Sequence, residues 1–157
     1  MASALTVAPV IRQAGKADVS AMIAIATAAY VIYVPRIGKE PAPMLADFAI
    51  HVARGEAYVL EDNGEVVAYI VTFEKDGGQF IENVAVRPSR HGQGHGKCLL
   101  GFAEDQARQG YRPRLFLYTN ALMTENLDFY PRLGYVETHR IQENGFDRVY
   151  FEKDLRA

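Results

Sequence analysis

Residues 84–97 read VAVRPSRHGQGHGK, and this stretch decides how the chain is organised. Its first residues are apolar and β-prone, and Pro88 ends a strand because it has no N–H to donate. Three alternate glycines, Gly92, Gly94 and Gly96, then lead into a helical pattern. Glycine accepts positive φ and lets the main chain approach a ligand closely, and a helix N-terminus offers unpaired N–H groups. The stretch therefore predicts a cradle for a pyrophosphate.

Other phosphate-binding loops do not fit this spacing. The Walker A pattern fails because His91 stands five residues before Gly96 and Cys98 replaces the required Ser or Thr. The dinucleotide fingerprint fails because Lys97 or Leu99 falls where its third glycine belongs. A flexible turn without a ligand is the remaining alternative, although each ordered glycine costs about 0.5–1 kcal/mol relative to alanine.

Hydrophobic periodicity extends the pattern on both sides of the loop. Strands are predicted at residues 7–12, 57–61, 66–73, 80–86, 115–119, 135–141 and 148–155, and helices at 18–34, 44–52, 96–109 and 124–132. Asn63-Gly64 is a strong signal for a two-residue hairpin, and Pro35 is expected to end the first helix. The order predicts an α+β fold, an α/β/α sandwich around a mixed, mostly antiparallel sheet with one parallel pair at the crossover helix.

The 157 residues fit a single domain spanning positions 1–157. With 17 basic against 19 acidic residues, the chain lacks the basic excess of a non-specific nucleic-acid binder. No run approaches the roughly 18 apolar residues of a membrane span. Residues 1–13 lack the charged start of a signal peptide. We therefore expect a cytoplasmic protein with neither nucleic-acid nor membrane partners.

The cysteine and the histidines do not suggest a metal site. Cys98 is the one cysteine, so no intrachain disulfide forms, and we expect it to be a buried structural thiol. His91 and His95 are four residues apart, but they lie in a glycine loop rather than on one face of a helix, so no metal is expected. His51 and His139 are expected at the surface.

This arrangement resembles the GNAT (general N-acetyltransferase) superfamily. In that family a V-x-V-x-P strand end precedes [Q/R]-x-x-G-x-[G/A] and a helix, which residues 84–88 and 91–96 match except that His91 replaces Gln or Arg. Residues 129–135, FYPRLGY, resemble the family's Y-x-x-x-G-[F/Y] ending. The resemblance covers roughly residues 57–155. It implies a GNAT-type sheet whose parallel strands splay apart.

The resemblance also implies acetyl-CoA as the acyl donor, lying between strands 80–86 and 115–119. The residues that would bind it are Val84, Ala85, Val86, His91, Gly92, Gln93, Gly94, His95, Gly96, Lys97, Asn126 and Tyr130. The main-chain groups of Val84 and Val86 would pair with the pantetheine arm. The asparagine that the family often places seven residues before the tyrosine is Met123 here, and Asn126 and Asn120 are nearby substitutes.

The implied reaction is acyl-CoA-dependent N-acetylation of a primary amine by direct attack in a ternary complex. The amine must lose a proton, and Glu82 is the candidate base, directly or through water, because it is the one ionisable side chain in the apolar strand 80–86. A salt bridge or a position at the rim would also explain it. Tyr130 is the candidate general acid for the leaving thiolate, against the alternative of a core aromatic. A strand-end amide such as that of Val84 can donate to the thioester oxygen.

The acceptor is a small molecule or a peptide amine, and Tyr33, Arg36, Tyr118 and Asn120 are its candidate contacts. The alternative is that the tyrosines pack and Arg36 is solvated. A non-catalytic acyl-CoA-binding or sensing module on the same fold is the main alternative function. Use of an exposed strand edge only for assembly is a third. By analogy with the family, a homodimer is a further expectation, through the C-terminal hairpin or a sheet edge.

Overall fold

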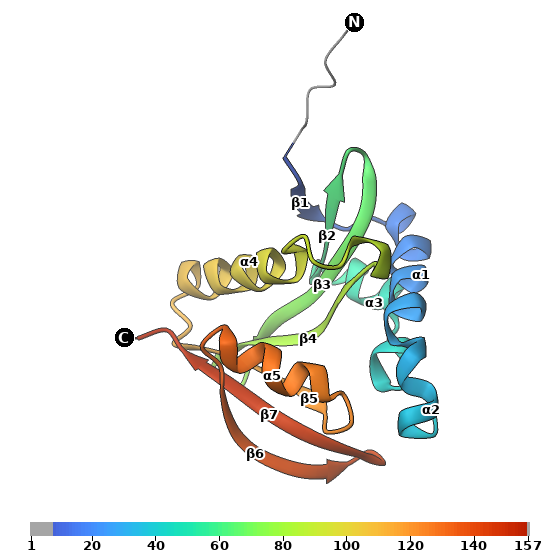
Figure 1. Ribbon diagram of the computed structural model, residues 1–157. Coiled ribbons are helices and arrows are strands. Elements are labelled where there is room, and N and C mark those ends of the chain that lie inside the picture. Colours follow the sequence, from blue (N-terminus) through green and yellow to red (C-terminus); the bar gives the residue numbers. More distant parts are fainter. Residues whose placement is uncertain (1–7, 157) are drawn as a thin grey trace, which may run out of the picture.

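The computed structural model describes residues 8–156, which fold around one seven-stranded sheet of order β1-β2-β3-β4-β5-β7-β6 (Figure 1). The strands are β1 (Val10–Gln13), β2 (Ala57–Asp62), β3 (Glu65–Lys75), β4 (Gly78–Val86), β5 (Arg114–Asn120), β6 (Val136–Glu143) and β7 (Phe146–Asp154). The helices are α1 (Val19–Tyr30), α2 (Val34–Ile37), α3 (Phe48–Ala53), α4 (His95–Gln109) and α5 (Thr124–Arg132). The predicted α+β fold is confirmed, although the start of the strand expected at 7–12 lies outside the described residues.

Helices cover both faces of the sheet and bury two separate cores. On one face, α1 and α3 place Met22, Ile25 and Phe48 against apolar side chains of β2 and β3. On the other face, Leu99 and Leu100 of α4 meet a second cluster contributed by the central strands and β7. Figure 1 shows α4 and α1 on opposite sides of the central strands. The sandwich arises because each helix has one apolar stripe to bury.

A β-bulge opens the sheet at its one parallel pair. Ile81 pairs with Thr72 and Asn83 pairs with Val71, so Glu82 is an extra residue in β4. A bulge bends its strand and redirects side chains. The parallel pairing of β4 with β5 covers only residues 79–81 and 115–117, after which the two strands diverge. The expected splay is confirmed, and it begins at the bulge.

One sequence expectation needs correction in the first helical segment. Pro35 does not end it, because Pro35 lies in the first turn of α2, where its missing N–H costs no hydrogen bond. The segment instead ends at Gly38, with φ of 87°. Residues 16–37 form a helical stretch that is long and apolar enough by composition to cross a membrane: its most apolar 18-residue window has a mean hydropathy of 1.7 and is 28% buried. Core helices and signal sequences meet the same criterion.

Candidate active site

The edge of β4 beyond the bulge carries free main-chain groups. The N–H of Arg87 bonds to the carbonyl of Val67, and in an antiparallel ladder such bonds fall on alternate residues. The main chains of Val84 and Val86 therefore face away from β3, into the opening toward β5. Ala85 does not reach this opening, because it pairs with Tyr69 and packs in the core beneath α1. Two of the three strand residues proposed to bind the donor thus present main-chain groups to the opening.

Side chains contact the carbonyls of both residues. The hydroxyl of Tyr30, at the end of α1, donates to the Val84 carbonyl at 2.7 Å. The Nε2 atom of His91 lies 3.1 Å from the Val86 carbonyl. His91, which replaces the family's Gln or Arg, thus joins the glycine loop to the end of β4.

The glycine loop has the geometry of an open cradle at the start of α4. Gly92 and Gly94 have φ of 82° and 81°, and a Cβ added at either would meet nothing within 4 Å. Gly94 is the N-cap of α4, so the unpaired N–H groups of the first turn face this open space. Space without side chains beside free N–H donors fits the diphosphate of coenzyme A.

The remaining side chains of the loop divide into anchors and exposed groups. Arg90 bonds to Asp62 at 2.9 Å and to Gln93 at 3.2 Å, which ties the loop to the β2–β3 hairpin. His95 is buried and contacts Gln93. Lys97 is exposed beside the cradle.

One expectation about the first turn of α4 was wrong. Cys98 is exposed, not the buried structural thiol that was expected. It lies on the part of the first turn that does not pack against the sheet.

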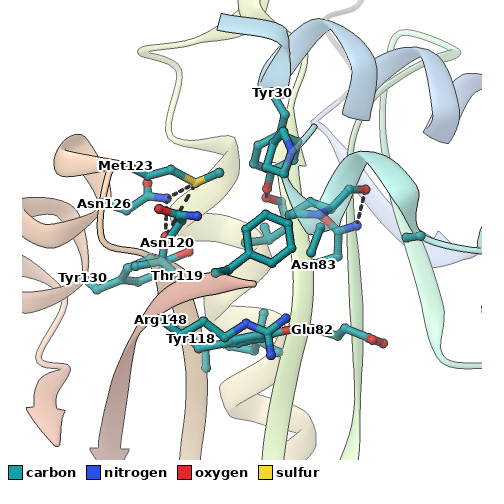
Figure 2. A pocket seen from close by; sticks show the side chains of 18 residues that line it. Tyr30, Glu82, Asn83, Tyr118, Thr119, Asn120, Met123, Asn126, Tyr130 and Arg148 are labelled. Carbon is teal, nitrogen blue, oxygen red and sulfur yellow. Dashed lines mark hydrogen bonds between the residues drawn. The ribbon is translucent and has the colours of Figure 1, made fainter. Parts of the chain in front are cut away.

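A pocket lies where β4 and β5 part (Figure 2). It is walled by the strands, by α1, by the start of α5 and by the loop that carries Pro41 and Pro43. Its polar lining consists of Tyr30, Glu82, Asn83, Tyr118, Thr119, Asn120, Asn126, Tyr130 and Arg148. Figure 2 shows Tyr30 descending from α1, opposite Asn126 and Tyr130 on α5. Residues from two helices, three strands and one loop are thereby gathered around one space.

Tyr130 and Asn126 occupy the α5 side of this pocket. Burial raises the pKa of Tyr130 above its ordinary value, with a further contribution from Tyr33, so its hydroxyl is protonated at neutral pH. Among residues 8–156 that hydroxyl makes no hydrogen bond, so it is available to a ligand. The amide of Asn126 donates to Thr119 at 3.0 Å and lies 3.7 Å from the sulfur of Met123. Asn126 therefore braces the start of α5 against β5.

Glu82 lines the pocket, but its carboxylate also turns toward α3. Its Oε2 atom lies 3.2 Å from Nε2 of His51, and Nδ1 of His51 lies 2.7 Å from Oε1 of Glu56. The expectation that His51 lies at the surface was wrong, since its side chain is 12% exposed and sits between two carboxylates. Sequence reasoning missed Glu56 altogether, because no spacing pattern links positions 51, 56 and 82.

The four candidate acceptor contacts separate into two groups. Tyr118 and Asn120 line the pocket, as the sequence suggested. Arg36 instead bonds to Oε1 of Glu125 at 2.7 Å and to the Leu122 carbonyl at 3.0 Å. Tyr33 lies 3.4 Å from the same carboxylate. The structure thus places Tyr33 and Arg36 in a bridge from the α1–α2 segment to α5, outside the pocket lining.

Comparison with known proteins supports this geometry. The profile of the acetyltransferase (GNAT) domain matches residues 53–137. Among solved structures, the ribosomal-protein-S18-alanine N-acetyltransferase from Escherichia coli has a TM-score of 0.75 and 19% identity, covering 96% of each chain. The PaiA N-acetyltransferase from Thermoplasma acidophilum, solved in complex with coenzyme A, has a TM-score of 0.78 and 15% identity over 94% of this chain and 99% of that one. No curated protein sequence matches.

The splayed sheet with a glycine loop at the N-terminus of α4 is therefore the fold of these acetyltransferase structures. Since the profile covers more than half of the chain, the protein belongs to the GNAT acetyltransferase family.

Proposed function

We propose that the protein is an N-acetyltransferase that moves an acetyl group from acetyl-CoA to a primary amine by direct attack in a ternary complex. The observation that carries the proposal is the free edge of β4 at Val84 and Val86, which leads directly into the open glycine cradle. Main-chain groups of β4 would hold the pantetheine arm like an added strand. The first turn of α4 would hold the diphosphate. Membership of the GNAT family supports the acyl transfer itself.

The pocket residues supply the remaining chemistry. An alkyl ammonium has a pKa near about 10, so a base must take a proton before the amine can attack. Glu82 is that base, directly or through water. The N–H of Val84 faces the opening and donates to the oxygen on which negative charge develops. Tyr130 donates its proton to the departing sulfur, and the burial that raises the pKa of this phenol also raises that of a thiol.

The acceptor enters beside Glu82, between Tyr118, Asn120 and the loop with Pro41 and Pro43. Arg148 lies in the same wall, where it bonds to Glu143 at 3.0 Å and covers the Tyr118 ring at 4.0 Å. This wall therefore contains an aromatic ring, Tyr118, a negatively charged group, Glu82, and a positively charged group, Arg148. It suits a polar amine, of small-molecule or peptide type, better than an apolar one.

Calorimetry with coenzyme A tests the cradle, and thiol release across a panel of primary amines tests transfer. We expect binding, a raised melting temperature and acceptor-dependent release. Tight binding without release for any amine would support a non-catalytic sensing module instead. No heat and no complex at millimolar coenzyme A would end both proposals. Glu82→Gln should retain binding and lose most of the turnover, and an unaltered pH–rate profile in that variant would exclude Glu82 as the base.

A further inference from the structure

We propose that His51, oriented by Glu56, is a positioning residue that takes the acceptor's proton from Glu82 and carries it out of the pocket. The proposal rests on the proposed function, because it assigns Glu82 the part of the base. The three residues come from α3, from the residue before β2 and from the bulge in β4. Their side chains form a continuous line of contacts from Glu82 in the pocket wall through His51 to Glu56.

The main chain holds this line in place. The N–H of Glu56 bonds to the His51 carbonyl at 3.1 Å, and the carbonyl of Glu56 accepts from Thr72 at 3.0 Å. The imidazole stacks on Phe73, with 6.3 Å between ring centroids and 17° between ring planes. The side chains of His51 and Glu56 are 12% and 15% exposed, so the contacts lie largely out of water. Such a frame fixes which nitrogen of the ring faces Glu82.

The two contacts of the imidazole are unequal, and this inequality suggests the tautomer. The 2.7 Å contact of Nδ1 with Glu56 has hydrogen-bond geometry. The 3.2 Å contact of Nε2 with Glu82 does not, and Oε2 of Glu82 is buried without a hydrogen-bond partner. If Nδ1 carries the proton and donates it to Glu56, Nε2 presents a lone pair to Glu82. An ionised Glu82 then finds no donor at Nε2.

Protonation of Glu82 is the first step of the proton path through His51 to Glu56. The acceptor ammonium gives a proton to the Glu82 carboxylate and becomes a neutral amine. A rotation of the protonated Glu82 side chain brings its O–H into line with Nε2. Transfer of that proton restores the Glu82 carboxylate and leaves an imidazolium between two carboxylates. The proton then leaves through Glu56, and His51 returns to its first tautomer. One proton enters and one leaves, so no other reactant is required.

The charged groups around His51 are few. Arg54 of α3 approaches Glu56 at 4.0 Å and is itself largely exposed. On the β5 side, Tyr118 lies near Glu82, and burial raises its pKa, with the Glu82 charge adding to the rise and Arg148 opposing it. From β3, uncharged Phe73 faces the ring.

Nitrogen-15 NMR of the wild-type protein tests the tautomer without any need for turnover. At the pH of the thiol-release assay we expect His51 to carry its proton on Nδ1 and to lose this preference in Glu56→Ala. A proton on Nε2 alone, or on both nitrogens, would leave no lone pair for Glu82 and would overturn the proposal. Because this readout needs no acceptor, it stays informative even if no amine in the panel is acetylated.

Kinetics test the coupling between His51 and Glu82. His51→Phe keeps a ring to stack on Phe73, and we expect kcat to fall about tenfold or more with an unchanged KM for acetyl-CoA. The control His139→Phe removes a histidine that stacks on Tyr150 and does not line the pocket, and it should turn over like wild type. Glu56→Gln, whose amide oxygen still accepts from Nδ1, should lose less kcat than Glu56→Ala.

The double variant that combines His51→Phe with Glu82→Gln should lose no more kcat than Glu82→Gln alone. Additive losses of kcat in the double variant would overturn the proposal.

Discussion

The hydroxyl of Tyr30 donates a hydrogen bond of 2.7 Å to the main-chain carbonyl of Val84, which joins α1 to the free edge of β4. Burial raises the pKa of Tyr30 well above its ordinary value, so this donor stays protonated. The bond lies where the structure opens for the donor. It therefore couples the helical layer to the geometry of the binding edge.

Tyr30→Phe removes this bond and keeps the ring. We expect the free energy of unfolding to fall by about 1 kcal/mol, because the Val84 carbonyl loses its partner. Bound coenzyme A can supply a new donor to that carbonyl, so the rise in melting temperature with coenzyme A should be at least as large as in wild type. Urea unfolding measures the first quantity, and thermal unfolding with and without coenzyme A measures the second. A variant as stable as wild type would show that the bond contributes nothing.

Gly94→Ala should weaken coenzyme A binding more than it weakens the fold. An alanine with φ near 81° is strained by about 1 kcal/mol, and its methyl group would stand in the cradle itself. Gly77→Ala is the matched control, because Gly77 has φ of 75°, equally open surroundings and a place in the distant β3–β4 turn. We expect both variants to lose similar stability and only Gly94→Ala to lose about tenfold or more in affinity by calorimetry. Equal affinities would remove the cradle from the proposal.

The sequence predicted the fold well because its signals are local. Asn63-Gly64, Asp76-Gly77 and Asn144-Gly145 all adopt positive φ at both positions, with values between 51° and 78°, as hairpin turns of this kind require. The strand–glycine–helix stretch likewise depends only on neighbours in the chain. Element types were therefore readable, and the boundaries shifted by only a few residues.

The site was less readable because its contacts join distant positions. The bulge at Glu82 arises from register with β3, and no residue preference in β4 marks it. His51 meets Glu82 across the gap between a helix and a strand, and Arg36 finds Glu125 at the far side of the opening. Sequence reasoning could name Glu82 and Arg36 as unusual, but the partner of each is fixed only by the packing of whole elements.

The bridge between Arg36 and Glu125 predicts a pH-dependent stability. Hydrogen bonding to Arg36 lowers the pKa of Glu125 from 4.5 to about 2. A lowered pKa in the folded state stabilises the protein above the unfolded value, and that stability is lost as the pH falls through the folded value. Glu125→Gln should therefore have a lower urea midpoint than wild type near neutral pH, with the difference shrinking as the pH falls from 4.5 toward 2. The effect should be small and sensitive to salt, because both side chains are exposed. A difference independent of pH would show that the charge of Glu125 is not responsible.

Tyr130→Phe tests the acid at the pocket. Because the Tyr130 hydroxyl makes no hydrogen bond to residues 8–156, its removal should leave the urea midpoint close to that of wild type. Its loss should lower kcat about tenfold or more, since Asn126, the other polar side chain of α5 in the pocket lining, has no acidic proton to give to the departing sulfur. Tyr135→Phe is the control: Tyr135 is also buried, its hydroxyl also lacks a partner, and its ring packs against Tyr130 at 5.6 Å without lining the pocket. Stopped-flow thiol release at saturating acetyl-CoA compares the turnover of the two variants. Equal turnover would mean that Tyr130 is a core aromatic and that another group or water is the proton donor.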